Sequence, residues 1–413
     1  MFLKNASIWY RDQIIHGHIV VNEITGLIER ISLSKISGIN SETTIDLKGK
    51  LIIPSLVDIH CHLRDFEESY KETYETGALA GAAGGFTTIF DMPNKKNPIN
   101  SSKSLKKVVE RTEKIQLCKI IPYILLNKDT ETSLISNHPY SKAYLGKTTG
   151  NYITNVSDVA VFLAQSSGVI AVHCEDNNRI NRNLKKFQPT LENHGKIRDS
   201  QTEILAIENL IETTKDIITK GKLHIAHVTV LESINILQSN GISFEVTPHH
   251  LFLNNDDLSQ LGVRGKMNPP LRPKLEQKKL LDAFFKNLIP LIGTDHAPHT
   301  MLEKEELELA GVPGLETCLP LLLDHCKPLD TKKLNIIIKS LAINPRALMN
   351  LPEKGIIAEN EPANLTVIDR KKIKVVQGDE LKTKCKWSPW EGYELQGWPV
   401  LTIREGKITY NEL

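Results

Sequence analysis

Short apolar runs and longer amphipathic stretches alternate through the middle of the chain. Eight apolar runs are typical of buried β-strands, and they end near His60, Asp91, Leu126, Leu145, His173, His227, Val246 and Asp295. The stretches between them predict helices over residues 72–83, 102–115, 155–165, 230–239 and 275–287, and Ser200-Gln-Thr-Glu203 predicts another that opens with a capping box. Strands alternating with helices in this number predict an α/β fold, a (β/α)8 TIM-type barrel rather than an open doubly wound sheet.

The two ends of the chain have a different pattern from the middle. Both consist of short β-like runs without the helical spacing between them, for example residues 14–21 near the start and residues 363–369 near the end. Neither end is long enough to enclose a good core alone. We therefore expect one composite β domain of residues 1–50 and 355–413, beside a barrel of residues 51–354.

Composition describes an ordinary globular protein and excludes some partners. The chain has 51 basic and 49 acidic residues, a formal net charge of +2, and a hydrophobic fraction of 40%. This balance gives no case for nucleic acid or an anionic membrane as partner, and no apolar run reaches the roughly 18 residues that span a bilayer. Six cysteines without CxxC spacing predict a reduced, cytoplasmic protein.

The stretch Asp58-Ile-His60-Cys-His62-Leu-Arg64 ends the first strong apolar run, which begins at Leu51. Side chains alternate along a strand, so His60 and His62 project the same way, with Asp58 and Arg64 on that side too. Two imidazoles at a strand end can share one metal ion, which leaves the arginine free for an anion. A pair of hydrogen-bonded core histidines is the alternative, and it is the more frequent one for this motif alone.

Further candidates for metal binding stand at other predicted strand ends. With the first pair they make five: His60, His62, His173, His227 and Asp295. Imidazole and carboxylate are the ligands that zinc prefers, and five exceed what one catalytic ion needs, so we expect two ions and a bridging ligand. Lys142 is a candidate for the bridge, because a buried lysine has a lowered pKa and its neutral amine can capture carbon dioxide as a carbamate. A surface lysine at a loop edge is the alternative.

Several motifs together resemble those of dihydroorotases, which belong to the amidohydrolase superfamily of barrel metalloenzymes. They occur in the family's order and cover nearly the whole chain: Asp58-Ile-His-Cys-His-Leu-Arg64, Asp91-Met-Pro-Asn94, His249-His250, Lys266-Met-Asn-Pro-Pro-Leu-Arg272, Thr294-Asp-His-Ala-Pro-His299 and Gly311-Val-Pro-Gly-Leu-Glu-Thr317. The sequence departs from the family pattern after Asn94, where Lys95-Lys96-Asn97 follows, and after Arg64, where Asp65-Phe-Glu-Glu68 follows. Both departures concern loop shape more than chemistry.

The resemblance implies a role for each candidate. His60, His62 and Asp295 would bind the more buried zinc ion, His173 and His227 the second, and carbamylated Lys142 would bridge the two. Asp295 would also carry the proton between the attacking hydroxide and the ring nitrogen. The remaining implied residues contact the substrate: Arg64, Asn94 and His299 at its carboxylate, with Asn268 and Thr148 as further contacts.

The implied reaction is the reversible cyclisation of N-carbamoyl-L-aspartate to dihydroorotate and water, in pyrimidine biosynthesis. One alternative is a related cyclic-amide hydrolase, an allantoinase or hydantoinase, which would need neither Arg64 nor Asn94. A second is an inactive barrel that serves as a scaffold, although such proteins usually lose metal ligands. We expect a small-molecule substrate, and the sequence leaves a homodimer and an association with aspartate transcarbamoylase open.

Overall fold

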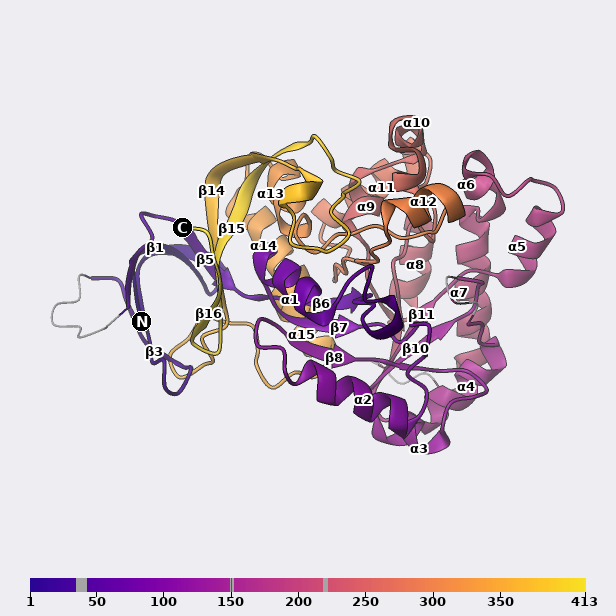
Figure 1. The fold of residues 1–413 in the computed structure, drawn as a ribbon, viewed down its shortest axis with the longest axis horizontal. Helices are drawn as coiled ribbons and strands as arrows, with labels where there is room; N and C mark the ends of the chain where they lie inside the picture. The colour runs from indigo at the N-terminus through magenta and orange to yellow at the C-terminus, as the bar shows by residue number, and fades with distance from the viewer. Residues whose placement is uncertain (35–42, 149, 151, 218–221) are drawn as a thin grey trace.

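The computed structural model describes residues 1–34, 43–148, 150, 152–217 and 222–413. Figure 1 shows a barrel with surrounding helices on one side and a sheet that contains both chain termini on the other. No helix among the described residues is long and apolar enough to cross a membrane.

The barrel consists of short parallel strands in two hydrogen-bonded groups. They are β6 (Leu56–Cys61), β7 (Phe86–Asp91) and β8 (Lys119–Pro122), then β9 (Ile124–Leu125), β10 (Tyr140–Tyr144), β11 (Val169–His173), β12 (Leu223–Ile225) and β13 (Ser243–Phe244). Only Tyr123 separates β8 from β9, so one stretch of chain joins the two groups. At the other side, Ile292 pairs with Val246 and His296 pairs with Cys61. These bridges close the ring, and the predicted (β/α)8 barrel is confirmed.

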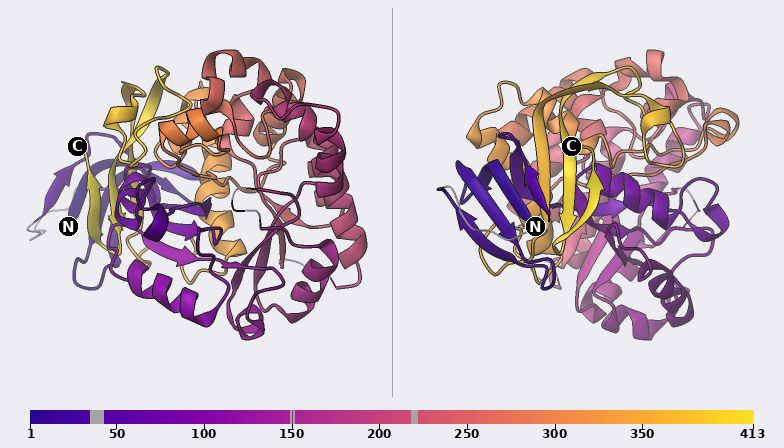
Figure 2. Two further views of the ribbon diagram at one scale, coloured as in Figure 1. Left: turned by 45° about the vertical axis from the view of Figure 1, so that its right-hand side comes forward. Right: turned by 60° about the vertical axis from the view of Figure 1, so that its left-hand side comes forward.

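Helices follow the strands and surround the barrel, as the left view of Figure 2 shows. The longer ones are α1 (Tyr74–Ala83), α2 (Ser102–Thr112), α4 (Val156–Gln165), α5 (Asn177–Leu184), α7 (Ser200–Thr214), α8 (Leu231–Ser239), α11 (Lys274–Phe285), α13 (Cys318–His325) and α14 (Thr331–Ile338). Shorter ones are α3 (Thr132–Asn137), α6 (His194–Ile197), α9 (Pro248–Phe252), α10 (Leu258–Leu261), α12 (Met301–Leu307) and α15 (Asn344–Leu348). The five helices predicted by range thus correspond to α1, α2, α4, α8 and α11.

The capping box predicted for α7 does not form. Asp199 is the N-cap, and its carboxylate accepts a hydrogen bond from the Thr202 backbone N–H at 3.1 Å. Glu203 is buried and its carboxylate instead accepts the backbone N–H of Thr229 at 3.1 Å. The residue before Ser200 therefore supplies the cap, and aspartate is among the residues preferred at this position.

Both ends of the chain contribute to the second sheet, seen in the right view of Figure 2. Its strands run in the order β16 (Lys407–Asn411), β15 (Glu394–Arg404), β14 (Leu365–Val375), β5 (Leu51–Pro54), β1 (Phe2–Tyr10), β2 (Gln13–Val21) and β3 (Ile28–Ser32). A further strand, β4 (Thr44–Asp46), pairs with β1. Buried side chains from the two ends of the chain, including Leu3, Ile8, Val367 and Leu401, form one core.

The apolar run that begins at Leu51 is two strands and not one. Ser55 donates its backbone N–H to Asn364 O at 2.9 Å, whereas Leu56 donates to Gly85 O at 3.0 Å. The chain therefore changes from the terminal sheet to the barrel between these two residues. The division at residues 50 and 355 stays a prediction, and the pairing assigns residues 51–54 to the terminal sheet.

Candidate active site

A cavity opens at the carboxyl ends of the barrel strands. Nine of the eleven predicted site residues line it: His60, His62, Arg64, Asn94, Thr148, His173, His227, Asn268 and Asp295. Lys142 and His299 are fully buried and lie beside lining residues, as described below. Tyr144, Ala297, Ala310 and Gly311 complete the lining and were not predicted. The nine predicted residues come from seven separate chain segments, which converge at one end of the barrel.

One side of the cavity, which we term the histidine wall, consists of His60, His62, His173, His227 and Asp295. The Asp295 Oδ1 atom lies 3.3 Å from His60 Nε2 and 3.1 Å from His62 Nε2. His173 Nδ1 and His227 Nε2 face each other at 2.9 Å. The ring centroids of His60 and His227 are 5.2 Å apart, so the two groups are contiguous.

The donor set of the histidine wall fits a divalent metal ion. One ligand atom each from His60, His227 and Asp295 can lie within 4.8 Å of one another, and all three residues are buried. Burial lowers the pKa of His60, and lowers that of His227 further, which keeps the rings neutral, the form in which imidazole binds metals. Convergent buried imidazoles and a carboxylate are the ligand types expected for zinc.

Lys142 lies on β10 with its amino group inside the barrel. Its Nζ atom has no hydrogen-bond partner among the described residues, and the side chain is fully buried. Burial lowers the pKa of Lys142 to about 8, and the charges of Glu245 and Asp295 oppose the shift. A neutral amine without a partner is the form that can react with carbon dioxide, so the surroundings fit the predicted carbamate.

Buried carboxylates support the histidine wall from behind, and sequence reasoning missed them. Glu245, one residue after β13, hydrogen-bonds His60 Nδ1 and lies 3.4 Å from His224 Nε2. Although burial raises the pKa of Glu245, the His60 and His224 rings hold it well below its usual range. Such partners fix the orientation and tautomer of a ligating imidazole. Glu245 precedes Val246, where a predicted strand ends, and this position at a strand end could have marked Glu245 as a site residue.

Glu175 supports His173 as Glu245 supports His60. Its carboxylate lies 2.9 Å from His173 Nε2 and also accepts a hydrogen bond from Arg198. Burial raises the pKa of Glu175, but Arg198 and His173 together lower it to about 2. A permanently ionised carboxylate behind His173 leaves the Nδ1 atom of this ring to face His227 and the cavity.

Asp58 does not lie on the cavity side as expected. Its carboxylate accepts hydrogen bonds from the Thr294 backbone N–H at 3.0 Å and from the Thr294 hydroxyl at 2.5 Å. The same carboxylate accepts the His60 N–H at 3.2 Å. Asp58 therefore holds the residue that precedes Asp295, and it positions the site without lining it.

The second side of the cavity consists of Arg64, Asn94 and Asn268, and the buried His299 lies against Arg64. We term these four residues the arginine wall. The Arg64 guanidinium donates from Nε to Pro298 O at 3.1 Å and contacts His299 Nε2 at 3.2 Å. Asn94 Oδ1 lies 2.7 Å from His62 Nδ1, so the two walls meet at this hydrogen bond. The Asn268 Oδ1 atom is buried without a partner among the described residues.

Backbone conformation is unusual at three of the site residues. Arg64, His227 and Asp295 have φ angles of 53°, 40° and 45°, in the left-handed region that residues with side chains rarely adopt. Residues held this way cluster at functional sites, where the surrounding structure imposes a conformation that the residue alone would avoid.

The barrel with its terminal sheet, and the cluster of histidines and carboxylates at its strand ends, fit a hydrolase of the amidohydrolase type. Comparison with a solved structure agrees with this fold. The fold matches L-hydantoinase (dihydropyrimidinase) from Arthrobacter aurescens with a TM-score of 0.92 and 22% identity, covering 100% of this chain and 96% of the other. Residues 49–186 match the family model described as Dihydro-orotase-like.

Two relatives narrow the class further. The chain is 36% identical over 407 residues to a dihydroorotase of Pyrococcus furiosus, covering 96% of this chain and 90% of the relative. It is 30% identical over 439 residues to a dihydroorotase of Geobacillus thermodenitrificans, covering 100% and 99%. This chain belongs to the dihydroorotase family, and it is a hydrolase that acts on cyclic amides.

Proposed function

We propose that this chain catalyses the reversible cyclisation of N-carbamoyl-L-aspartate to (S)-dihydroorotate and water in pyrimidine biosynthesis. The observation that carries the proposal is the Arg64 guanidinium, which lines the same cavity as the histidine wall. Dihydroorotate combines a cyclic amide with a carboxylate, and a guanidinium is a strong, oriented partner for a carboxylate. A hydrolase of uncharged cyclic amides has no use for this cation.

The arginine wall would hold the substrate carboxylate. Arg64 supplies the charge, and Asn94 has its side-chain NH2 to offer because its Oδ1 atom already faces His62 Nδ1. His299 contacts the guanidinium from behind and orients it, with the ring itself fully buried. Asn268 and Thr148 line the cavity and are proposed as further contacts to the ring.

The histidine wall would hold two zinc ions. His60, His62 and Asp295 would bind one, His173 and His227 the other, and a carbamate on Lys142 would bridge them. Support comes from the ligand atoms of His60, Asp295 and His227, which converge across the two proposed sites. The buried amino group of Lys142, which has no partner among the described residues, is a further support. When bound, the metal supplies Lewis-acid chemistry, which polarises the amide carbonyl and makes water a nucleophile at neutral pH.

Asp295 would move the proton. In hydrolysis its carboxylate accepts a proton from the attacking water and delivers it to the ring nitrogen as the carbon–nitrogen bond breaks. In cyclisation the same proton returns from nitrogen to the departing water. Burial raises the pKa of Asp295, while the charges of His60 and Lys142 oppose the rise.

Turnover of three cyclic amides tests the proposal. Purified protein with zinc should hydrolyse dihydroorotate and should form it from N-carbamoyl-L-aspartate, with lower activity on allantoin and hydantoin. Chelation of the metal should remove the activity and added zinc should restore it. Activity on allantoin or hydantoin alone would contradict the substrate assignment. Absence of both turnover and bound zinc would favour the scaffold alternative.

Location and assembly stay predictions. The six cysteines are free thiols, five of them buried and Cys385 half-buried, which accords with the expected reducing, cytoplasmic setting. Association with a second copy or with aspartate transcarbamoylase is proposed from the resemblance alone, and the mass of the protein in solution would test the first of these.

A further inference from the structure

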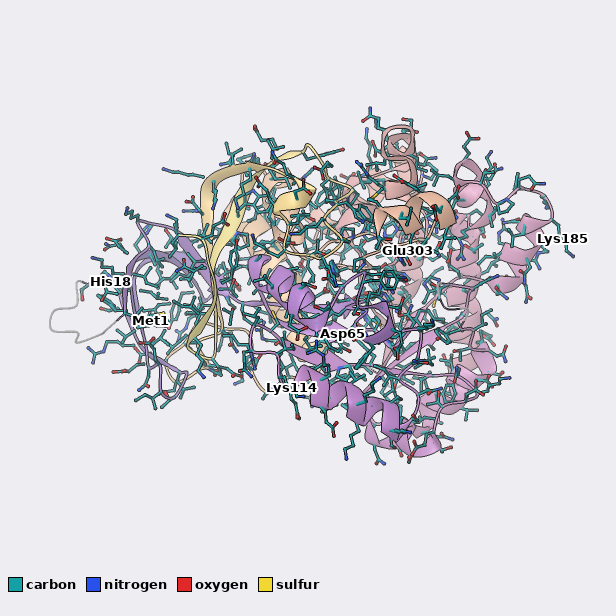
Figure 3. The ribbon with its side chains drawn as sticks, viewed as in Figure 1. Met1, His18, Asp65, Lys114, Lys185 and Glu303 are labelled. Carbon is teal, nitrogen blue, oxygen red and sulfur yellow. The ribbon has the colours of Figure 1, made fainter. Side chains whose placement is uncertain are left out.

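The loop that carries Arg64 has an unusual backbone. Arg64, Asp65 and Phe66 have φ angles of 53°, 56° and 49°, so three consecutive residues lie in the left-handed region without a glycine among them. Such a conformation persists only where surrounding contacts impose it. Asp65, labelled in Figure 3, lies in this turn between β6 and α1.

Lys95, four residues beyond the end of β7, hydrogen-bonds the backbone of this loop. Its Nζ atom donates to the Arg64 carbonyl at 2.6 Å and pairs with Asp91 Oδ2 at 2.8 Å. The Lys95 side chain is only 5% exposed, and the Asp91 side chain is fully buried. A buried ammonium held by a carboxylate and a carbonyl is a strong, directional contact.

Asp91 also hydrogen-bonds the backbone of Leu63, the residue before Arg64. Its Oδ1 atom accepts the Leu63 backbone N–H at 2.9 Å, and its Oδ2 atom accepts the Tyr74 hydroxyl at 3.0 Å. Lys95 and Asp91 together therefore bind the backbone on both sides of the Arg64 Cα atom. The direction in which the Arg64 side chain leaves the backbone depends on this pair.

The far side of the loop is anchored independently. The Asp65 carboxylate accepts the Phe66 N–H at 2.5 Å and the Tyr74 N–H at 2.8 Å, and it pairs with Arg111 at 3.1 Å. These contacts hold the loop to α1 whether or not Lys95 is present. Loss of the Lys95 contact should consequently loosen Arg64 without unfolding the loop.

Lys95 itself does not line the cavity. Among the described residues that line the cavity, Arg64 and Asn94 are present and Lys95 is absent. The Arg64 guanidinium has contacts of its own at Pro298 O and His299, so its position depends on the backbone at one end and on these contacts at the other. The two departures from the family motif, at Lys95 and at Asp65-Phe66, thus meet in this network.

We propose that Lys95 is a positioning residue, which fixes the Arg64 backbone and thereby aims the guanidinium at a carboxylate on the substrate. This inference rests on the proposed function, because it concerns recognition of the carboxylate by the same site. Lys95 would act on substrate affinity through Arg64 and would leave the histidine wall, where the bond breaks, unchanged.

Steady-state kinetics with dihydroorotate test the inference. The variant Lys95→Met, which removes the ammonium and keeps the chain length, should raise KM about tenfold while kcat stays within about threefold of wild type. Lys95→Gln keeps an N–H donor and should raise KM less. Lys96→Met, at the exposed neighbouring lysine, is the matched control and should match wild type.

The possible results distinguish a failure of the inference about Lys95 from a failure of the proposed function. An unchanged KM in Lys95→Met, or a fall in kcat at constant KM, overturns the inference, because either result would give Lys95 a general structural role or none. If Lys95→Met does not fold, the same criteria apply to Lys95→Gln. A wild-type protein without turnover of dihydroorotate would instead overturn the proposed function, whatever the variants do.

Discussion

The two walls of the cavity are built in different ways. The histidine wall comes from strand ends or the residues next to them: His60 lies in β6, His173 ends β11 and His227 follows β12 by two residues. The arginine wall comes from loops, with Arg64 three residues beyond β6 and Asn94 three beyond β7. Backbone hydrogen bonds of the barrel place the first wall, whereas side-chain contacts to loop backbone place the second.

Both walls nevertheless depend on buried charged residues behind them. Glu245 and Glu175 orient imidazoles of the histidine wall, and Lys95 with Asp91 holds the backbone of the arginine wall. The buried charges of the histidine wall hold imidazole rings, whereas those of the arginine wall hold backbone peptide groups. We infer that the histidine wall determines the chemical step and the arginine wall the choice of substrate, and variants on each wall can separate these effects.

The largest effect is expected for Asp295→Asn. The substitution keeps the shape of the side chain and removes the group proposed to carry the proton, so kcat should fall by about three orders of magnitude or more. Folding should be retained, because the barrel contacts of the neighbouring Thr294 and His296 are unchanged. Turnover and far-UV circular dichroism measure the two properties, and near-normal turnover would contradict the role of Asp295.

A smaller effect, of another kind, is expected for Arg64→Met. Loss of one charge-assisted contact to a carboxylate costs about 1.5–3 kcal/mol, which corresponds to a rise in KM of about ten- to a hundredfold. The metal content should not change, because Arg64 belongs to the arginine wall. Kinetics with dihydroorotate and zinc analysis of the same sample check both points. A normal KM would show that another group binds the carboxylate.

The two walls could be predicted from the sequence to different extents. The histidine wall could be predicted because each member ends an apolar run, and parallel strands in a barrel bring such ends together. His60 and Asp295 are 235 positions apart, yet the strand pattern alone predicted that they would meet. The same reasoning predicted the barrel and the joining of the two chain ends in one sheet.

What escaped prediction depends on long-range contacts without a local pattern. Nothing near Lys95 in the sequence shows that its amino group reaches the Arg64 carbonyl, because both residues lie in loops. Asp58 shares the strand face of His60 by periodicity, but its carboxylate turns to Thr294. The passage of the chain from the terminal sheet to the barrel at Ser55 was also missed, because buried strands of both sheets are runs of apolar residues. Hydrogen-bond partners that are distant in the sequence, in side chains or in the backbone, decided each of these cases.

The last prediction concerns the number of metal ions in the histidine wall. Lys142→Ala removes the amine proposed to bridge the two sites, so zinc in protein purified with excess metal should fall from about two ions per chain towards one. Lys128→Ala, at an exposed lysine, is the control and should retain the wild-type content. Zinc is measured against protein concentration, and the intact mass of the folded wild type, measured at neutral pH, reports a carbamate. Retention of two ions by Lys142→Ala would show that the His173–His227 pair holds its metal without a bridge. The buried lysine would then act on the site only through its charge, which interacts with Glu245 and Asp295.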